Sequence, residues 1–279
     1  MCSANTRKSS FPPAVINDPV TNEHLRMKGR RPHPLRVATR LVRLAGAILI
    51  GLLDYLVHCA FRRPEARLAI RARWLQRASR RTLRLFHFEM QASGPVPGRG
   101  LLISNHLSYL DVLVLSSLTP AVFVSKHDVK FWPVFGQFAV LGGTVFVDRA
   151  RRFQVGQTND EITAALNQGA LVVLFPEGTS TNGQTLLPFK SSLLEPATHP
   201  EWPLAIAWIH YEIDDGDAGE EICYWGNHTF FPHMLNLLGK HRVRATVRFG
   251  QFSERSGDRK ELAQRLRAEI LDLKENWCA

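Results

Sequence analysis

The sequence predicts an α/β protein with a mostly parallel sheet flanked by helices, and with an N-terminal membrane-associated helical segment. Short apolar runs alternate with longer helical segments in residues 91–279, which is typical of α/β domains. An 18-residue apolar run precedes them, and basic residues are concentrated in the N-terminal third. The 279 residues are 45% hydrophobic and 22% charged, which excludes a disordered, collagen-like or polytopic membrane chain.

The charge is divided unequally along the chain. Residues 1–99 carry 19 Lys and Arg against 5 Asp and Glu, a net charge of +14, whereas the remaining residues carry a net charge of −4. A basic block of this kind implies an anionic partner, either nucleic acid or membrane lipid. The four cysteines are scattered without a CxxC pair, so we expect no metal site, no disulfide scaffold and a reducing compartment.

Residues 1–34 are Pro-rich and polar, and we expect a disordered tail there; residues 35–90 are expected to form basic membrane-associated helices. The apolar run Leu44–Phe61 would make a helix of about 27 Å, slightly short of a bilayer core of about 30 Å. It contains Asp54 and His58, which are costly at the centre of a bilayer. We therefore expect an embedded or re-entrant helix, with a single span or a buried soluble helix as alternatives.

Residues 65–88 form a second helical pattern, in which arginines recur every four residues beside apolar partners. This pattern favours an amphipathic basic helix that lies on a membrane surface. The alternative is a helix packed on the α/β domain with its arginines in solvent.

The α/β domain, residues 91–279, begins after the break GPVPG at 94–98. Apolar runs predict strands at 100–104, 121–125, 144–147, 170–175, 203–211, 221–225 and 243–249. Helices are expected near 107–118, 128–141, 152–168 and 258–275. Because α/β sheets bind ligands at the carboxyl ends of their strands, the polar residues that follow these runs are candidates for the site.

The segment SNHLSYLD at 104–111 follows the first of these strands and leads into a helix. If a turn begins at His106, the carboxylate of Asp111 can reach its imidazole, fix the tautomer and stabilise the imidazolium. Such a histidine could deprotonate a hydroxyl. The spacing alone is also compatible with a capped helix start that has a hydrogen-bonded histidine.

Three other strand ends carry candidate binding residues. FPEGT at 175–179 contains Glu177, Gly178 and Thr179, where backbone N–H groups near Gly178 could stabilise an oxyanion; the alternative role of Glu177 is to cap backbone amides. Arg149 could clamp an anionic head group or pair with its neighbouring aspartate on the surface, and Lys126 is a similar case.

In this order, NHLSYLD, GGTVFVDR, FPEGT and the Pro-led strand PLAIAWI resemble the glycerolipid acyltransferases, in particular the 1-acylglycerol-3-phosphate acyltransferase type. The resemblance covers roughly residues 85–250 and extends to the segment LPFK that contains Lys190. It implies that His106 is the general base and Asp111 its orienting carboxylate. It implies substrate binding by the other residues of the matching blocks, namely Lys126, Arg149, Glu177, Gly178, Thr179 and Lys190.

The resemblance further implies transfer of a fatty acyl group from acyl-CoA or acyl-carrier protein to the free hydroxyl of a lysolipid. We expect 1-acylglycerol-3-phosphate as the acceptor, with phosphatidic acid as product, no cofactor besides the acyl donor, and a catalytic domain on the cytoplasmic face of a membrane. Ser180 occupies a position where many phosphate-accepting members carry Arg. Another lysolipid such as lyso-ornithine lipid is therefore the alternative acceptor.

Functions of other classes remain as alternatives. A thioester hydrolase would use the same base with water, and a non-catalytic lipid-binding protein would not need the intact pair of His106 and Asp111. We expect no nucleic-acid partner, because the basic residues flank an apolar run and match no nucleic-acid motif.

Overall fold

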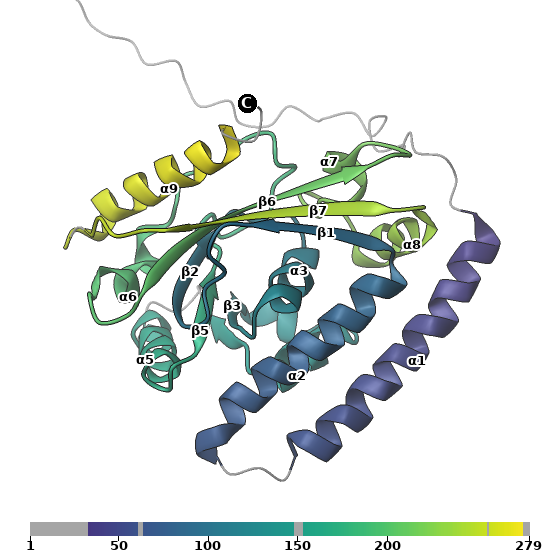
Figure 1. Cartoon of the computed structure of the whole chain (residues 1–279), viewed down its shortest axis with the longest axis horizontal. Coiled ribbons are helices and arrows are strands. Elements are labelled where there is room, and N and C mark those ends of the chain that lie inside the picture. Colours follow the sequence, from purple (N-terminus) through teal and green to yellow (C-terminus); the bar gives the residue numbers. More distant parts are fainter. Residues whose placement is uncertain (1–32, 61–63, 148–152, 256, 276–279) are drawn as a thin grey trace, which may run out of the picture.

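The computed structural model describes residues 33–60, 64–147, 153–255 and 257–275, and a seven-stranded sheet forms its centre (Figure 1). The strand order is β1-β7-β6-β2-β5-β3-β4. The strands are β1 (Phe88–Ser93), β2 (Gly100–Ser104), β3 (Val122–Lys126), β4 (Val145–Val147), β5 (Leu171–Leu174), β6 (Leu204–Ile213) and β7 (Val243–Gln251). All adjacent pairs are parallel except β6 and β7, which confirms the predicted mostly parallel sheet.

Helices cover both faces of the sheet, as the α/β pattern predicts. One hydrophobic core lies between the sheet and α2 (Pro64–Leu85), α3 (Leu110–Leu118) and α8 (Phe230–Gly239). A second core lies under α5 (Phe153–Asn167), α6 (Glu195–Thr198) and α9 (Arg259–Glu275) on the other face (Figure 1). β2 and β5 lie between the two cores and are buried throughout, which explains why they read as uninterrupted apolar runs.

Two of the predicted elements are wrong or incomplete. The strand expected at 221–225 is absent: Glu221 ends the short helix α7 (Ala218–Glu221), and the N–H of Tyr224 donates to the carbonyl oxygen of Leu107, not to a sheet neighbour. The helix expected at 128–141 is divided into the 3-10 helix η1 (His127–Phe131) and α4 (Phe135–Gly142). Pro133 lacks an N–H and Val134 has a φ of 63°, so a continuous helix cannot pass through them.

The N-terminal helix α1 (Pro34–His58) is 25 residues long, and among the described residues it alone is long and apolar enough to cross a membrane. Only 11% of its apolar window is buried inside the protein. Its inner face contacts α2 and α8 at several points. Arg36 and Arg40 donate to carbonyl oxygens at the C-terminal end of α8, and the indole N–H of Trp74 donates to the carbonyl oxygen of Gly51 at 2.7 Å.

Helix α2 packs on the α/β domain, which is the alternative that the sequence left open for residues 65–88. Trp74 and Leu83 are buried in the core, and Arg80 donates to the carbonyl oxygen of Ser117 at the end of α3. Arg77 makes two hydrogen bonds to Asp54 of α1, at 3.0 and 2.9 Å. Part of the basic charge of this helix is therefore used inside the protein. The expected tail at 1–34 lies outside the described residues, apart from its last two.

Candidate active site

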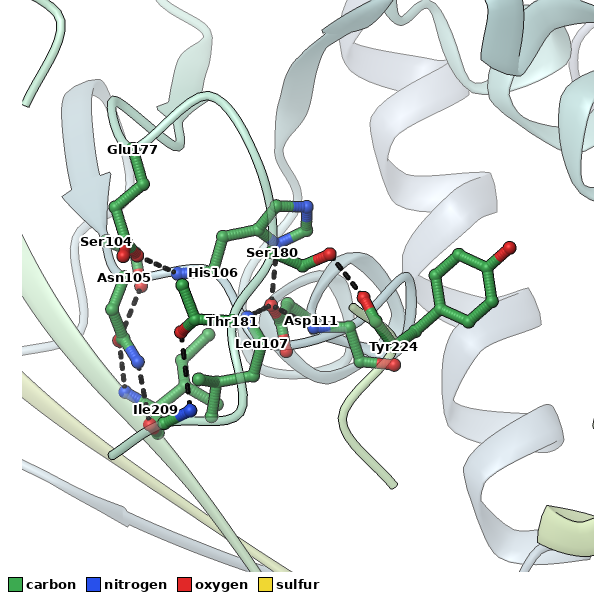
Figure 2. Close-up of polar contacts among 12 residues, drawn as sticks. Ser104, Asn105, His106, Leu107, Asp111, Glu177, Ser180, Thr181, Ile209 and Tyr224 are labelled. Atoms are coloured by element: carbon green, nitrogen blue, oxygen red, sulfur yellow. Dashed lines mark hydrogen bonds and ion pairs between the residues drawn. The ribbon is translucent and has the colours of Figure 1, made fainter. Parts of the chain in front are cut away.

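The candidate base stands on a segment that is fixed to the sheet immediately after β2. Asn105 exchanges two hydrogen bonds with the backbone of Ile209 in β6, at 3.0 and 2.7 Å (Figure 2). The carbonyl oxygen of His106 accepts from the N–H of Thr181 at 3.0 Å. These bonds fix the backbone on both sides of the imidazole, so the ring has a defined position at the carboxyl end of the strand.

Asp111 lies in the first turn of α3, where its carboxylate accepts four hydrogen bonds. Oδ2 accepts from the Nδ1 of His106 at 2.7 Å and from the N–H groups of Leu107 and Ser108 at 2.7 and 3.0 Å. Oδ1 accepts from the hydroxyl of Tyr211 at 2.7 Å. The carboxylate is fully buried, and the contact with Nδ1 leaves Nε2 as the ring nitrogen that can take up a proton.

The imidazole of His106 stacks on the ring of Phe175, with a centroid separation of 4.2 Å and an interplanar angle of 17°. Its side chain is 23% exposed. The histidine is therefore held from one side by Asp111 and on one ring face by Phe175, and it remains open to a cavity.

Glu177 holds the FPEGT turn against the histidine segment. Its Oε1 accepts from the N–H of His106 at 2.8 Å (Figure 2). Its Oε2 accepts from the N–H of Leu187 at 2.9 Å. Burial raises the pKa of this carboxyl, and the two backbone hydrogen bonds oppose that shift. The side chain does not reach the cavity, so its geometry matches the alternative role of capping backbone amides.

A cavity of about 400 Å³ begins at His106 and extends under the N-terminal helices. Its far part is apolar and is lined by Leu44 and Ile48 of α1, Leu75 of α2 and Phe138 of α4. Its other wall contains aromatic and polar side chains from the segment between β6 and β7, including Tyr224, Trp225, His228 and Phe230. The arrangement can hold an apolar chain beside a proton acceptor.

The structure brings together some of the predicted binding residues. Lys126, at the end of β3, lines the cavity together with Gly178 and Thr179. Lys190 is exposed and is not among the residues that line the cavity. Arg149 lies outside the described residues. The N–H of Gly178 donates to the carbonyl oxygen of Phe175 at 3.1 Å, so this particular group is already used and is not an oxyanion donor.

Sequence reasoning missed the hydroxyl of Tyr211 and the amide of Asn105, which both fix the pair of His106 and Asp111. Tyr211 is distant in sequence, at the end of a run that read as a buried strand. Asn105 belongs to the segment SNHLSYLD, and an amide directly after a buried strand could have indicated a hydrogen bond to a neighbouring strand. The aromatic segment at 224–230 was also missed, because residues 221–225 were read as a strand.

Comparisons with known proteins show the family to which the chain belongs. The sequence model of the acyltransferase family matches residues 86–208. The lyso-ornithine lipid O-acyltransferase of Brucella abortus is 37% identical over 198 residues, which are 65% of this chain and 74% of that protein. The chain belongs to the lysolipid acyltransferase family. Resemblance to the glycerolipid acyltransferases is thereby confirmed.

Other members show how this lysolipid acyltransferase is related within the family. The lyso-ornithine lipid O-acyltransferase of Rhizobium meliloti is 34% identical over 72% of this chain and 76% of that protein. The 1-acyl-sn-glycerol-3-phosphate acyltransferase of Neisseria gonorrhoeae is 31% identical over 46% of this chain and 54% of that protein. The crystal structure of the 1-acyl-sn-glycerophosphate acyltransferase from Thermotoga maritima matches 86% of this chain with a TM-score of 0.60 and 17% identity, which supports the fold.

Proposed function

We propose that the protein transfers an acyl group from a thioester of coenzyme A or acyl-carrier protein to the free hydroxyl of lyso-ornithine lipid. The observation that carries the proposal is the 2.7 Å contact of the His106 Nδ1 with a fully buried carboxylate, at the mouth of a largely apolar cavity. The acceptor is chosen from two relatives named as lyso-ornithine lipid acyltransferases, of which the chain covers 74% and 76%.

The reaction needs one proton acceptor and one place for a long chain. The acceptor hydroxyl donates its proton to Nε2 of His106 while its oxygen attacks the thioester carbonyl carbon. The carboxylate of Asp111 stabilises the imidazolium that forms. When the tetrahedral intermediate collapses, the carbon–sulfur bond breaks and the imidazolium returns the proton to the departing thiolate. The apolar end of the cavity, beside Ile48 and Phe138, holds an acyl chain during these steps.

The outer face of α1 is the part of the enzyme proposed to contact the membrane. Leu49, Leu53 and Val57 follow at intervals of four residues and are 59%, 53% and 72% exposed. One end of α1 contacts the α/β domain through Arg36, and the other end contacts α2 through Asp54. This geometry favours a helix that lies in the plane of one leaflet over a helix that spans it.

The catalytic domain is assigned to the cytoplasmic side. Cys223 is a free and buried thiol, as expected in a reducing compartment.

A second acceptor, 1-acylglycerol-3-phosphate, is favoured by the relative from Neisseria gonorrhoeae and by the motif resemblance. Lys126 lines the cavity and could contact its phosphate, and the family resemblance assigns Arg149 a similar role. The position of Ser180 argues against this acceptor, because its hydroxyl donates to the carbonyl oxygen of Tyr224 and supplies no positive charge.

Acyl-transfer assays on the full chain in lipid vesicles would test the proposal. Palmitoyl-CoA and palmitoyl-acyl-carrier protein would be the donors, with lyso-ornithine lipid and lysophosphatidic acid as alternative acceptors. We expect lyso-ornithine lipid to be acylated and His106→Ala to abolish the transfer. The matched control is His199→Ala, because the side chain of His199 is 52% exposed and lies outside the cavity. Retained transfer in His106→Ala would refute the mechanism, and thiol release without any lysolipid would favour a hydrolase.

A further inference from the structure

The wall of the cavity that lies beside the candidate base is formed by the connection between β6 and β7, outside the residues that the family model matches. Tyr224 is fixed to both motifs of the site. Its N–H donates to the carbonyl oxygen of Leu107 at 2.8 Å, and its carbonyl oxygen accepts from the hydroxyl of Ser180 (Figure 2). The segment therefore has a defined position next to His106.

Aromatic rings dominate this wall. The ring of Tyr224 lies 5.6 Å from that of Trp132 and 5.5 Å from that of Tyr109, with interplanar angles of 78° and 67°. The indole N–H of Trp225 donates to the carbonyl oxygen of Gly219 at 2.9 Å, which orients the ring. Both Tyr224 and Trp225 line the cavity and are partly exposed to it. Faces of tyrosine and tryptophan rings attract ammonium groups through their quadrupoles.

The charge around the wall also favours a cation. Residues 212–229 contain six Asp and Glu and no Lys or Arg, although the whole chain has a net charge of +10. Several of these acids are paired with Lys240, Arg242 or Arg244. Asp217 and Glu220 are exposed and flank Gly219, the residue that holds the indole of Trp225. Neither carboxylate lines the cavity, but both add negative charge beside Trp225, which favours an ammonium over a phosphate there.

We propose that Tyr224 and Trp225 form the subsite for a positively charged ammonium on the acceptor head group. This inference rests on the proposed function and specifies how the acceptor is recognised. Ornithine is a diamino acid, so an N-acylated ornithine keeps one ammonium and one carboxylate. Lys126 at the end of β3 also lines the cavity and provides a positive charge for the carboxylate.

The experiment compares lyso-ornithine lipid with the same lipid after acetylation of its amine, which removes the positive charge. The readout is the ratio of kcat/KM for the charged acceptor to kcat/KM for the acetylated acceptor. We expect Trp225→Leu to lower this ratio about 5- to 30-fold, the factor that corresponds to a cation–π contact of about 1 to 2 kcal/mol. Tyr224→Leu should lower it in the same way, and Trp225→Phe should lower it less, because the ring face is kept.

Trp202→Leu is the matched control, since Trp202 is partly buried and lies outside the cavity, and it should leave the ratio unchanged. Equal losses for both acceptors in Trp225→Leu and Tyr224→Leu would overturn the ammonium subsite while the proposed function stands. Turnover of lysophosphatidic acid alone would overturn the subsite and also the choice of acceptor. Absence of acyl transfer to any lysolipid by the unmodified chain would instead refute the proposed function itself.

Discussion

Replacement of Asp111 by asparagine isolates the charge of the carboxylate from its shape. An amide oxygen in the place of Oδ2 can still accept from the N–H groups of Leu107 and Ser108, which are 2.7 and 3.0 Å away in the native protein. The amide nitrogen can then donate to the hydroxyl oxygen of Tyr211. We therefore expect the Asp111→Asn protein to fold, with a change in the free energy of unfolding below about 2 kcal/mol.

In the proposed mechanism, the loss of charge acts on the imidazolium that forms when His106 takes up the proton of the acceptor. The contact distance of 2.7 Å between Nδ1 and Oδ2 places the two charge centres about 4 Å apart, where their attraction is about 4 kcal/mol at an effective dielectric constant of about 20. This energy corresponds to about a 1000-fold decrease in kcat/KM. The amide oxygen in the place of Oδ2 can still accept from Nδ1, so the tautomer of His106 is kept and the decrease reports the loss of charge.

The assay is the initial rate of acyl transfer to lyso-ornithine lipid in vesicles, with thermal unfolding measured on the same preparation. Tyr211→Phe is the matched control, because it removes one hydrogen bond to the same carboxylate and keeps the charge. We expect it to lower kcat/KM much less than Asp111→Asn does. An Asp111→Asn protein that keeps kcat/KM within tenfold of the native value would refute the role assigned to the carboxylate.

Three further predictions concern stability. Burial lowers the pKa of His233 from 6.5 to about 4. The neutral histidine therefore stabilises the folded protein fully above pH 6.5, and the free energy of unfolding should fall by about 3 kcal/mol as the pH falls to 4. Urea unfolding at several pH values should show this loss in the native protein and much less of it in His233→Phe. Gly100→Ala should lower the free energy of unfolding by more than about 2 kcal/mol, because Gly100 has a φ of 86° and a Cβ would overlap the carbonyl oxygen of the residue before β6. Gly98→Ala is the control: no atom lies within 4 Å of its Cβ, so the same measurement should show no change. Arg77→Leu removes two hydrogen bonds from Asp54 but leaves its contact with Arg81. The midpoint of urea unfolding should therefore fall by the equivalent of about 1 kcal/mol, and an unchanged midpoint would show that this partly exposed pair does not stabilise the fold.

The strands of the α/β domain could be predicted because their environment is uniform. β2 and β5 are buried on both faces and are therefore apolar at every position, and they are found within one residue of the expected ends. β1 (Phe88–Ser93) was not predicted, because it is an edge strand in which only Phe88 and Met90 are partly buried and the other residues are exposed. Its polar sequence, FEMQAS, gave no apolar run to detect.

The pair of His106 and Asp111 could be predicted from local spacing, since Asp111 follows His106 by five positions at one strand end. The groups that hold this pair in place could not be predicted, because Tyr211 and Ile209 lie about a hundred residues further along the chain. Only the pairing of β2 with β6 brings them to the same place. The role of Glu177 was undecided in the sequence for a related reason: its two N–H donors belong to His106 and Leu187, in separate segments.

The net charge of the N-terminal third indicates an anionic partner, but it does not show where each arginine lies in the structure. Arg36 and Arg40 donate to carbonyl oxygens at the end of α8 and hold α1 on the α/β domain, whereas Arg77 pairs with Asp54 and holds α1 on α2. The same helices also wall the cavity through Leu44 and Ile48 of α1. Because α1 presents an apolar face outward and lines the cavity inward, an acyl chain that enters beside it can stay in apolar surroundings until it reaches the imidazole. In the proposed arrangement, attachment to a membrane and access to the candidate base depend on this one element, and its Arg36, Arg40 and Asp54 are paired toward the protein.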